Sequence, residues 1–281
     1  MANYYCLMAG LPDIELSDTH PGYTFEQLKE QCDESLTKED KKLLFFFFLK
    51  YDCMNIVRLL KDPDAEVDPL GNFSLDQYRD LLTSARELNF NVHRYPSFMS
   101  IFAREYSYNK DTEGYFPEDE MMLAYLQYCL RECPDKTMKK WYQLTLDINN
   151  ILTAMIARKQ GWNVTDFIMG DGVVQEMIRE NKTKDFDLSL QYDYVKELMK
   201  IVDEEDPVRK EKMIDALKWT WLDDATFFEP FDIDALFAYL CKLEIQRRWE
   251  KLDVEQGKET FKQIIENLRG EAKVPDEFIQ K

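Results

Sequence analysis

The chain is poor in the residues that break regular structure, with only 9 Gly and 10 Pro among 281 residues. These small numbers leave little material for the many tight turns of an all-β fold. Long apolar runs are also missing. The most apolar stretch covers only residues 43–49, whereas a membrane-spanning helix needs about 20 apolar residues. The sequence therefore predicts a mainly helical protein that does not insert directly into lipid.

Basic residues are scarce relative to acidic ones. The chain contains 36 Lys and Arg against 54 Asp and Glu, which gives a formal net charge of −18. Nucleic-acid phosphates and anionic lipid headgroups both attract clustered basic side chains. We therefore expect no nucleic-acid partner. A solvated acidic surface and an acidic face that binds a basic protein partner are both compatible with this charge.

Cys and His, the residues that most often bind zinc or carry out redox chemistry, are few, and their spacing does not match a known metal site. The chain has 6 Cys and 2 His, and neither His20 nor His93 has a zinc-type spacing to another ligand. The first 16 residues lack the basic start of a signal peptide, so we expect reduced thiols in the cytoplasm. Cys129 and Cys133 share one helix face, where buried apolar residues are favoured over a redox switch.

Three further patterns are poor candidates for a site. The alternating acids of residues 62–68 lack the sixth-position Gly and the twelfth-position Glu of a calcium loop. The Gly170–Gly172 segment is typical of a helix break, since no strand precedes it. The pairs Asp223–Asp224 and Glu204–Glu205 are typical of helix-end charges, although divergent pKa values would permit acid/base chemistry. We expect no catalytic residue, no cofactor-binding residue and no metal ligand.

Apolar residues recur at helical spacing along most of the chain. Thr37 precedes an acidic first turn, and Pro117 occupies a favourable first helical position. The stretch 1–8 is compatible with a strand. Helices are predicted after Thr37, after Ser74 towards Leu88, over 117–133, across the Trp141–Met155 stripe, and at about 163–169, 173–181, 190–203, 207–222 and 258–269, with a further stripe from Asp232 to Leu252.

A short pattern recurs three times, starting at Asp52, Asp147 and Asp232. Each copy is interpreted as an Asp that begins a helix, followed by apolar residues at helical spacing and then a basic residue. An internal repeat indicates related structural units. The sequence thus predicts three helical units in one compact body, with approximate boundaries at 1–110, 111–186 and 187–281.

The first two copies share one more polar residue. Asn55 and Asn150 each follow their Asp by three positions, where the side chain of a capping box reaches back to the helix start. The third copy has Ala235 at that position. The interpretation predicts that Asp147→Ala loses one cap and about 1 kcal/mol of stability.

Four segments resemble a known family. Residues 231–249 and the closing 261–269 resemble the end of the C subunit of the V/A-type rotary ATPases, which corresponds to the d subunit of eukaryotic V-ATPases. Residues 147–159 resemble a helix of the same family. The start, residues 4–12, is closer to a bacterial family of uncharacterised proteins that are associated with V-type ATPases and are similar to this C subunit.

The resemblance implies an all-α, funnel-like body of three similar units. It also implies a non-catalytic role, in which the chain couples the central shaft of the ATPase to the membrane rotor ring. The location would be cytoplasmic and peripheral to the membrane through protein contacts. One alternative is a free-standing cytosolic helical adaptor. Another is a metal-dependent hydrolase that uses Asp223 and Asp224.

Overall fold

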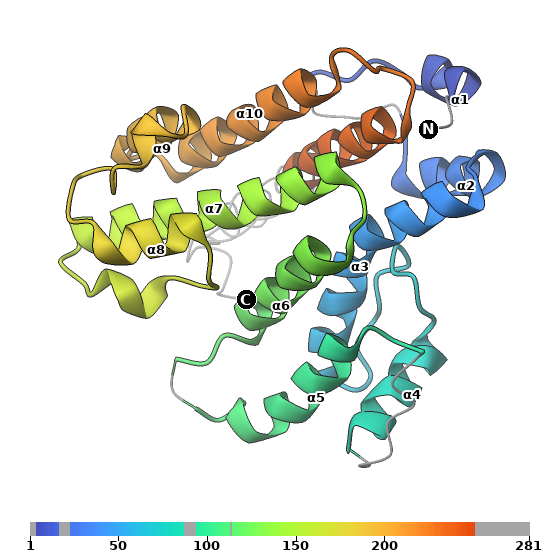
Figure 1. The fold of residues 1–281 in the computed structure, drawn as a ribbon. Coiled ribbons are helices and arrows are strands. Elements are labelled where there is room, and N and C mark those ends of the chain that lie inside the picture. Colours follow the sequence, from blue (N-terminus) through green and yellow to red (C-terminus); the bar gives the residue numbers. More distant parts are fainter. Residues whose placement is uncertain (1–3, 17–22, 87–93, 113, 251–281) are drawn as a thin grey trace, which may run out of the picture.

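The computed structural model describes residues 4–16, 23–86, 94–112 and 114–250 (Figure 1). Within these ranges the chain is helical and contains no strand, which confirms the predicted all-α class. No helix in this part of the chain is long and apolar enough to cross a membrane. The helices are α1 (Tyr5–Gly10), α2 (Phe25–Ser35), α3 (Lys38–Lys61), α4 (Leu75–Arg86), α5 (Ser97–Asn109), α6 (Pro117–Glu132), α7 (Lys136–Lys159), η1 (Val164–Phe167), α8 (Val173–Glu180), η2 (Leu188–Leu190), α9 (Tyr194–Asp203), α10 (Pro207–Thr226) and a last helix described over 233–250.

Local signals position several helix starts as predicted. The Thr37 side chain accepts a hydrogen bond from the Asp40 backbone N–H at 3.2 Å, and Pro117 begins α6. The interpretation of residues 1–8 as compatible with a strand is wrong for the part that is described, because the chain forms helix α1 from Tyr5 onward. The predicted helix at 258–269 lies outside the described residues, as do His20 and His93.

The prediction that each copy of the repeated pattern begins a helix is wrong for the first two copies. Asp52 lies inside the 24-residue helix α3, and Asp147 lies inside the 24-residue helix α7. The caps are instead Thr37 and Asp135. Both helices continue through the Asp because apolar residues on either side pack into the core, and partners from distant segments satisfy the buried carboxylate. Only the third copy begins a helix.

In the third copy, Asp232 caps the helix as predicted. The Asp232 carboxylate accepts a hydrogen bond from the Ala235 backbone N–H at 3.0 Å, at the start of the last helix. The three copies are therefore not equivalent by position in their helices. The predicted division at 110 and 186 and the funnel shape stay predictions.

Two buried apolar clusters hold the helices together. The first contains residues of α3, α6 and the last helix, such as Leu49, Met121 and Phe237. The second joins α7 to α8 and α9, through residues such as Ile148 and Leu198. Helix α7 contributes to both clusters, and Figure 1 shows it between the α8–α9 side and α6. Helix α7 also lines the cavity that is described below.

Candidate functional site

The Asp52 carboxylate lies at the centre of a buried polar cluster. It accepts hydrogen bonds from the Asn72 backbone N–H at 2.6 Å, the Asn72 side-chain amide at 2.6 Å, the Phe73 backbone N–H at 3.0 Å and the Tyr78 hydroxyl at 2.6 Å. Burial raises the pKa of Asp52 to about 6, although these hydrogen bonds favour the charged form. The cluster joins α3 to the following loop and to α4, so Asp52 is a structural carboxylate.

Asp147 has a comparable position in α7. Its carboxylate accepts hydrogen bonds from Gln143 of the same helix at 2.8 Å and from Gln175 of α8 at 3.1 Å. Burial raises the pKa of Asp147, and the two glutamine amides oppose that change. The prediction that Asp147 acts as a cap is therefore wrong, because it fastens the interior of α7 to the next helix.

The two asparagines of the repeat bind the loops that follow their helices. Asn55 donates to the Asp68 carbonyl at 2.9 Å and accepts from the Asp68 N–H at 2.7 Å. Asn150 donates to the Met169 carbonyl at 3.0 Å and accepts from the Met169 N–H at 2.8 Å. Each amide thus satisfies both backbone groups of one loop residue. The contact between Asn55 and Asp68 holds the end of the acidic loop 62–68 against α3.

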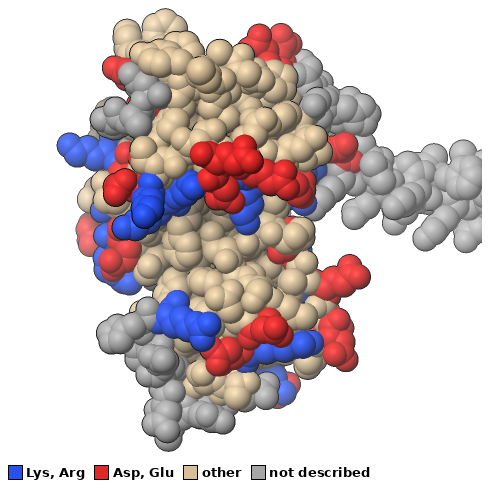
Figure 2. All heavy atoms as spheres, turned by 90° about the vertical axis from the view of Figure 1, so that its right-hand side faces the viewer, with Lys and Arg blue, Asp and Glu red and all other residues tan. Residues whose placement is uncertain are grey.

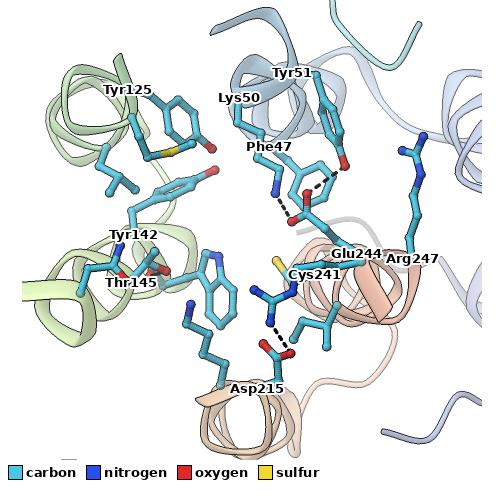
Figure 3. A pocket seen from close by; sticks show the side chains of 17 residues that line it. Phe47, Lys50, Tyr51, Tyr125, Tyr142, Thr145, Asp215, Cys241, Glu244 and Arg247 are labelled. Carbon is cyan, nitrogen blue, oxygen red and sulfur yellow. Dashed lines mark hydrogen bonds and ion pairs between the residues drawn. The ribbon is translucent and has the colours of Figure 1, made fainter. Parts of the chain in front are cut away.

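A cavity of about 540 Å³ lies among α3, α6, α7, α10 and the last helix (Figure 3). Aromatic side chains from three of these helices form much of its wall: Phe47, Tyr51, Tyr125, Trp141 and Tyr142. Thr145 and Asn149 of α7 add polar groups. The cavity therefore combines flat apolar surfaces with hydrogen-bonding side chains, as small-molecule sites usually do.

Charged residues line the same cavity. Lys50 of α3 forms an ion pair with Glu244 of the last helix, and the Tyr51 hydroxyl donates to Glu244 at 2.9 Å (Figure 3). Burial lowers the pKa of Lys50 to about 8, and the nearby cations Lys218 and Arg248 act in the same direction. Lys50 is thus a half-buried cation that is paired with one carboxylate.

A second charged group enters the cavity from α10. Asp215 is buried and accepts hydrogen bonds from the Arg248 guanidinium and from the Trp249 indole N–H, the latter at 2.7 Å. Lys218 lies one helical turn further along α10, and burial lowers its pKa. Within the described ranges Lys218 makes no hydrogen bond and no ion pair. Asp215 and Glu211 oppose this change in pKa, but among the four cations of the cavity lining Lys218 alone has no direct ion pair in these ranges.

A separate surface feature lies where α10 ends. Phe227, Phe228 and Phe231 are 75%, 86% and 36% exposed, and Tyr5 of α1 is 57% exposed. The rings of Tyr5 and Phe231 lie 4.8 Å apart, and those of Phe227 and Phe228 lie 5.1 Å apart. We call these four residues the aromatic patch. In Figure 2, the upper part of the molecule, towards α1, is mostly uncharged above a band of mixed charge.

The other candidates from the sequence have ordinary positions. Asp223 forms an ion pair with Lys242, and Asp224 is exposed near the end of α10. Glu204 accepts hydrogen bonds from the Glu205 and Asp206 N–H groups at the end of α9, at 3.0 and 3.1 Å. No cluster of three or more potential metal ligands occurs in the part of the chain that is described.

The remaining two candidates also have local structural roles. Cys129 and Cys133 are buried at the end of α6, in the first apolar cluster. Gly170 has a φ of +78° in the turn between η1 and α8, where a residue with a side chain would be strained. The structure does not bring these residues into the cavity.

Sequence reasoning missed both the cavity and the aromatic patch. The cavity residues come from five helices that are far apart in the chain, so no spacing pattern identifies them. The patch had one available signal, since Phe227 and Phe228 are adjacent and cannot both face the core from one helix end.

The chain belongs to the family described as protein of unknown function, DUF2764, whose family model matches residues 1–272. This match over nearly the whole chain corrects the resemblance to the C subunit of the V/A-type ATPases, for which the comparisons give no family evidence. No curated protein matches the chain, and no solved structure matches it.

Proposed function

We propose that this member of the DUF2764 family is a non-catalytic, protein-binding component of a larger assembly, and that the aromatic patch is its docking surface. The observation that carries the proposal is the exposure of Phe227 and Phe228, at 75% and 86%. Aromatic residues are enriched at protein interfaces, where a few well-packed residues supply most of the binding free energy. Clustered exposed aromatic rings on a globular protein commonly mark such surfaces.

The patch is held in place by the rest of the fold. The Tyr4 backbone N–H donates to the Phe231 carbonyl at 2.6 Å, so α1 is attached to the turn that presents the phenylalanines. The Thr226 hydroxyl donates back to the Leu222 carbonyl at 2.9 Å at the end of α10. An ordered aromatic surface binds a partner at a smaller entropic cost than a flexible one.

The buried acids support a structural role for the interior. Asp52 and Asp147 accept hydrogen bonds that connect helices to loops and to other helices, and Asp215 is engaged by Arg248 and Trp249. Carboxylates used in this way hold the helices in fixed relative positions. A stiff body of this kind transmits force between two partner surfaces, since packed interiors have low compressibility.

As the specific assembly we propose a V/A-type rotary ATPase, with the chain placed between the central shaft and the membrane ring. The long helices α3 and α7, of 24 residues each, and their buried polar attachments suit a part that passes torque. The alternative is a free-standing cytosolic adaptor, which would use the same aromatic patch for a different partner. The family assignment itself favours neither assembly.

The experiment is an affinity purification of the tagged full chain from gently solubilised native membranes, followed by mass spectrometry. Recovery of the catalytic, shaft and ring components in a fixed ratio would support the rotary ATPase. Recovery of the chain without them, at a salt concentration where the ATPase stays whole, would favour the adaptor.

A variant series tests the docking surface itself. The double variant Phe227→Ser/Phe228→Ser should lose the co-purified partners, because both exposed rings are removed. Tyr108→Ser is the matched control, since Tyr108 is 79% exposed on α5 and does not belong to the patch. Equal partner recovery with both variants would exclude the aromatic patch as the docking surface.

A further inference from the structure

The cavity has an excess of positive charge in a protein of net charge −18. The cationic side chains come from three helices and outnumber the acidic ones by four to two: Lys50, Lys218, Arg247 and Arg248 against Asp215 and Glu244. With Lys protonated, the lining therefore has two more positive than negative charges. Because acidic residues dominate the whole chain, this local reversal of sign distinguishes the cavity from the protein surface around it.

The existing ion pairs leave part of this charge without a partner. Lys50 pairs with Glu244, and Arg248 pairs with Asp215 and, at 3.4 Å, with Glu211, which does not line the cavity. Lys218 has no hydrogen-bond or ion-pair partner in the described ranges. Arg247 forms an ion pair with Asp68, with a nitrogen–oxygen distance of 3.9 Å. Asp215 and Glu211 attract Lys218 without pairing with it directly. A half-buried cation without a directly paired anion is costly, so an added anion would stabilise the site.

The shape of the cavity indicates the rest of the ligand. Its volume of about 540 Å³ is within the range of roughly 300–1,000 Å³ that is usual for small-molecule sites. The rings of Phe47, Trp141 and Tyr142 line the wall beside the charged groups. Flat apolar rings favour stacking with a flat ring of a ligand. Phe47 and Tyr142 already pack against Phe237, so the half-buried Trp141 is the ring of this wall with the most exposed surface for a ligand.

We propose that this cavity binds a small organic phosphate that has an aromatic ring. The phosphate would lie on the side lined by Lys218 and Arg248, where its negative charge would pair with Lys218, which has no ion-pair partner in the described ranges. The ring would lie against the aromatic wall at Trp141. Arg and Lys are the side chains that proteins use most for phosphate, through charge-assisted hydrogen bonds. This inference does not depend on the docking role of the aromatic patch.

The test is isothermal titration calorimetry of the full chain with adenosine monophosphate as probe. Adenosine and inorganic phosphate serve as the two partial ligands. We expect saturable binding of adenosine monophosphate with one site per chain, and weaker binding of each part alone. Lys218→Met should weaken the affinity about tenfold or more, because a charge-assisted hydrogen bond is lost. Lys218→Arg should retain most of the affinity.

Lys212→Met is the matched control, since Lys212 is an exposed lysine of α10 that does not line the cavity. Its affinity should equal that of the unmodified chain. Urea unfolding of each variant shows whether the fold is intact, and Lys218→Gln replaces Lys218→Met if the latter is unstable. The absence of binding at millimolar probe, or equal weakening by Lys212→Met, would overturn the proposal. The Phe227→Ser/Phe228→Ser variant should bind the probe normally, which separates this site from the docking surface.

Discussion

Asn55 of α3 and Asn150 of α7 make the same pair of hydrogen bonds to the loop that follows their helix. Each side-chain amide donates to the carbonyl and accepts from the N–H of a single backbone residue, Asp68 in one case and Met169 in the other. In both helices a buried Asp three positions earlier binds the next helix. The two Asp-x-x-Asn pairs are thus alike in what they bind, although neither begins a helix.

This relationship predicts a large effect of removing either amide. Asn55 and Asn150 are buried, so Asn55→Ala or Asn150→Ala leaves one part-buried backbone N–H and one part-buried carbonyl without their partner. Each unsatisfied group costs about 1–3 kcal/mol, so we expect the free energy of unfolding to fall by roughly 2–4 kcal/mol in each variant. Urea denaturation followed by far-ultraviolet circular dichroism measures this change.

Asn149→Ala is the control for these variants. Asn149 is adjacent to Asn150 in α7 but exposed, so its replacement should change the stability by less than about 0.5 kcal/mol. An Asn150→Ala variant as stable as Asn149→Ala would mean that water replaces the amide at Met169, and that the contact does not fasten the loop.

A second prediction concerns the close approach of Gly71 to the Asp52 cluster. A Cβ added at Gly71 would lie 2.8 Å from the Asp52 carboxylate, 3.1 Å from the Asn55 amide and closer still to the Tyr78 hydroxyl. These groups are fixed by their own hydrogen bonds and cannot easily move. We expect Gly71→Ala to destabilise the chain by about 2 kcal/mol or more, from displacement of a buried network.

Gly10→Ala provides the comparison for Gly71→Ala, because a Cβ at Gly10 has no other atom within 4 Å. It should leave the midpoint of thermal unfolding nearly unchanged. A Gly71→Ala variant with the same midpoint as Gly10→Ala would show that the loop next to Asp52 rearranges at little cost.

Helix starts were predictable where the determining contacts are local. Thr37 caps α3 through a backbone N–H only three residues away, and Pro117 begins α6 through its own fixed φ angle. The role of Asp52 was not predictable in this way. Its partners Asn72 and Tyr78 are 20 and 26 residues away, so only the folded chain shows that a helix interior can hold this carboxylate.

The cavity shows the same limit more strongly. Lys50, Trp141, Lys218 and Arg248 meet only because α3, α7, α10 and the last helix pack around one space. Each residue alone has the appearance of an ordinary helix-surface or core residue. The family resemblance failed for a related reason, since apolar helical patterns such as residues 231–249 are shared by many unrelated helical proteins.

A third prediction concerns the dependence of stability on pH. Burial raises the pKa of Asp52 to about 6, from an ordinary value of 3.8. Between these values the folded chain binds more protons than the unfolded chain, so the contribution is fully present below pH 3.8 and is lost as the pH rises through 6. We expect the free energy of unfolding to fall between pH 4 and pH 7. Asp234, whose pKa is also raised to about 6, acts in the same direction.

Urea unfolding at a series of pH values measures this dependence. Asp52→Asn removes the titrating group and should flatten the curve between pH 4 and pH 7, whatever its effect on stability at one pH. Asp64→Asn removes an exposed acid from the same loop region and should leave the slope as it is. Identical slopes for the original chain and Asp52→Asn would rule out a raised pKa at Asp52.

The last prediction tests the ion pair that crosses the cavity, between Lys50 and Glu244. Glu244→Gln keeps an oxygen that can accept the Tyr51 hydrogen bond but leaves the Lys50 cation without its anion. The two side chains are 22% and 29% exposed, so solvent screens part of the cost, and we expect a loss of about 1–3 kcal/mol. Lys50→Met/Glu244→Gln should recover most of this loss, because it removes the unpaired charge and places an apolar side chain beside the Phe47 and Tyr51 rings, over which the Lys50 ammonium lies. A complete double-mutant cycle, from the free energies of unfolding of the two single variants and the double variant, gives the coupling free energy between Lys50 and Glu244. A coupling free energy near zero would mean that the aromatic contacts, and not Glu244, stabilise Lys50.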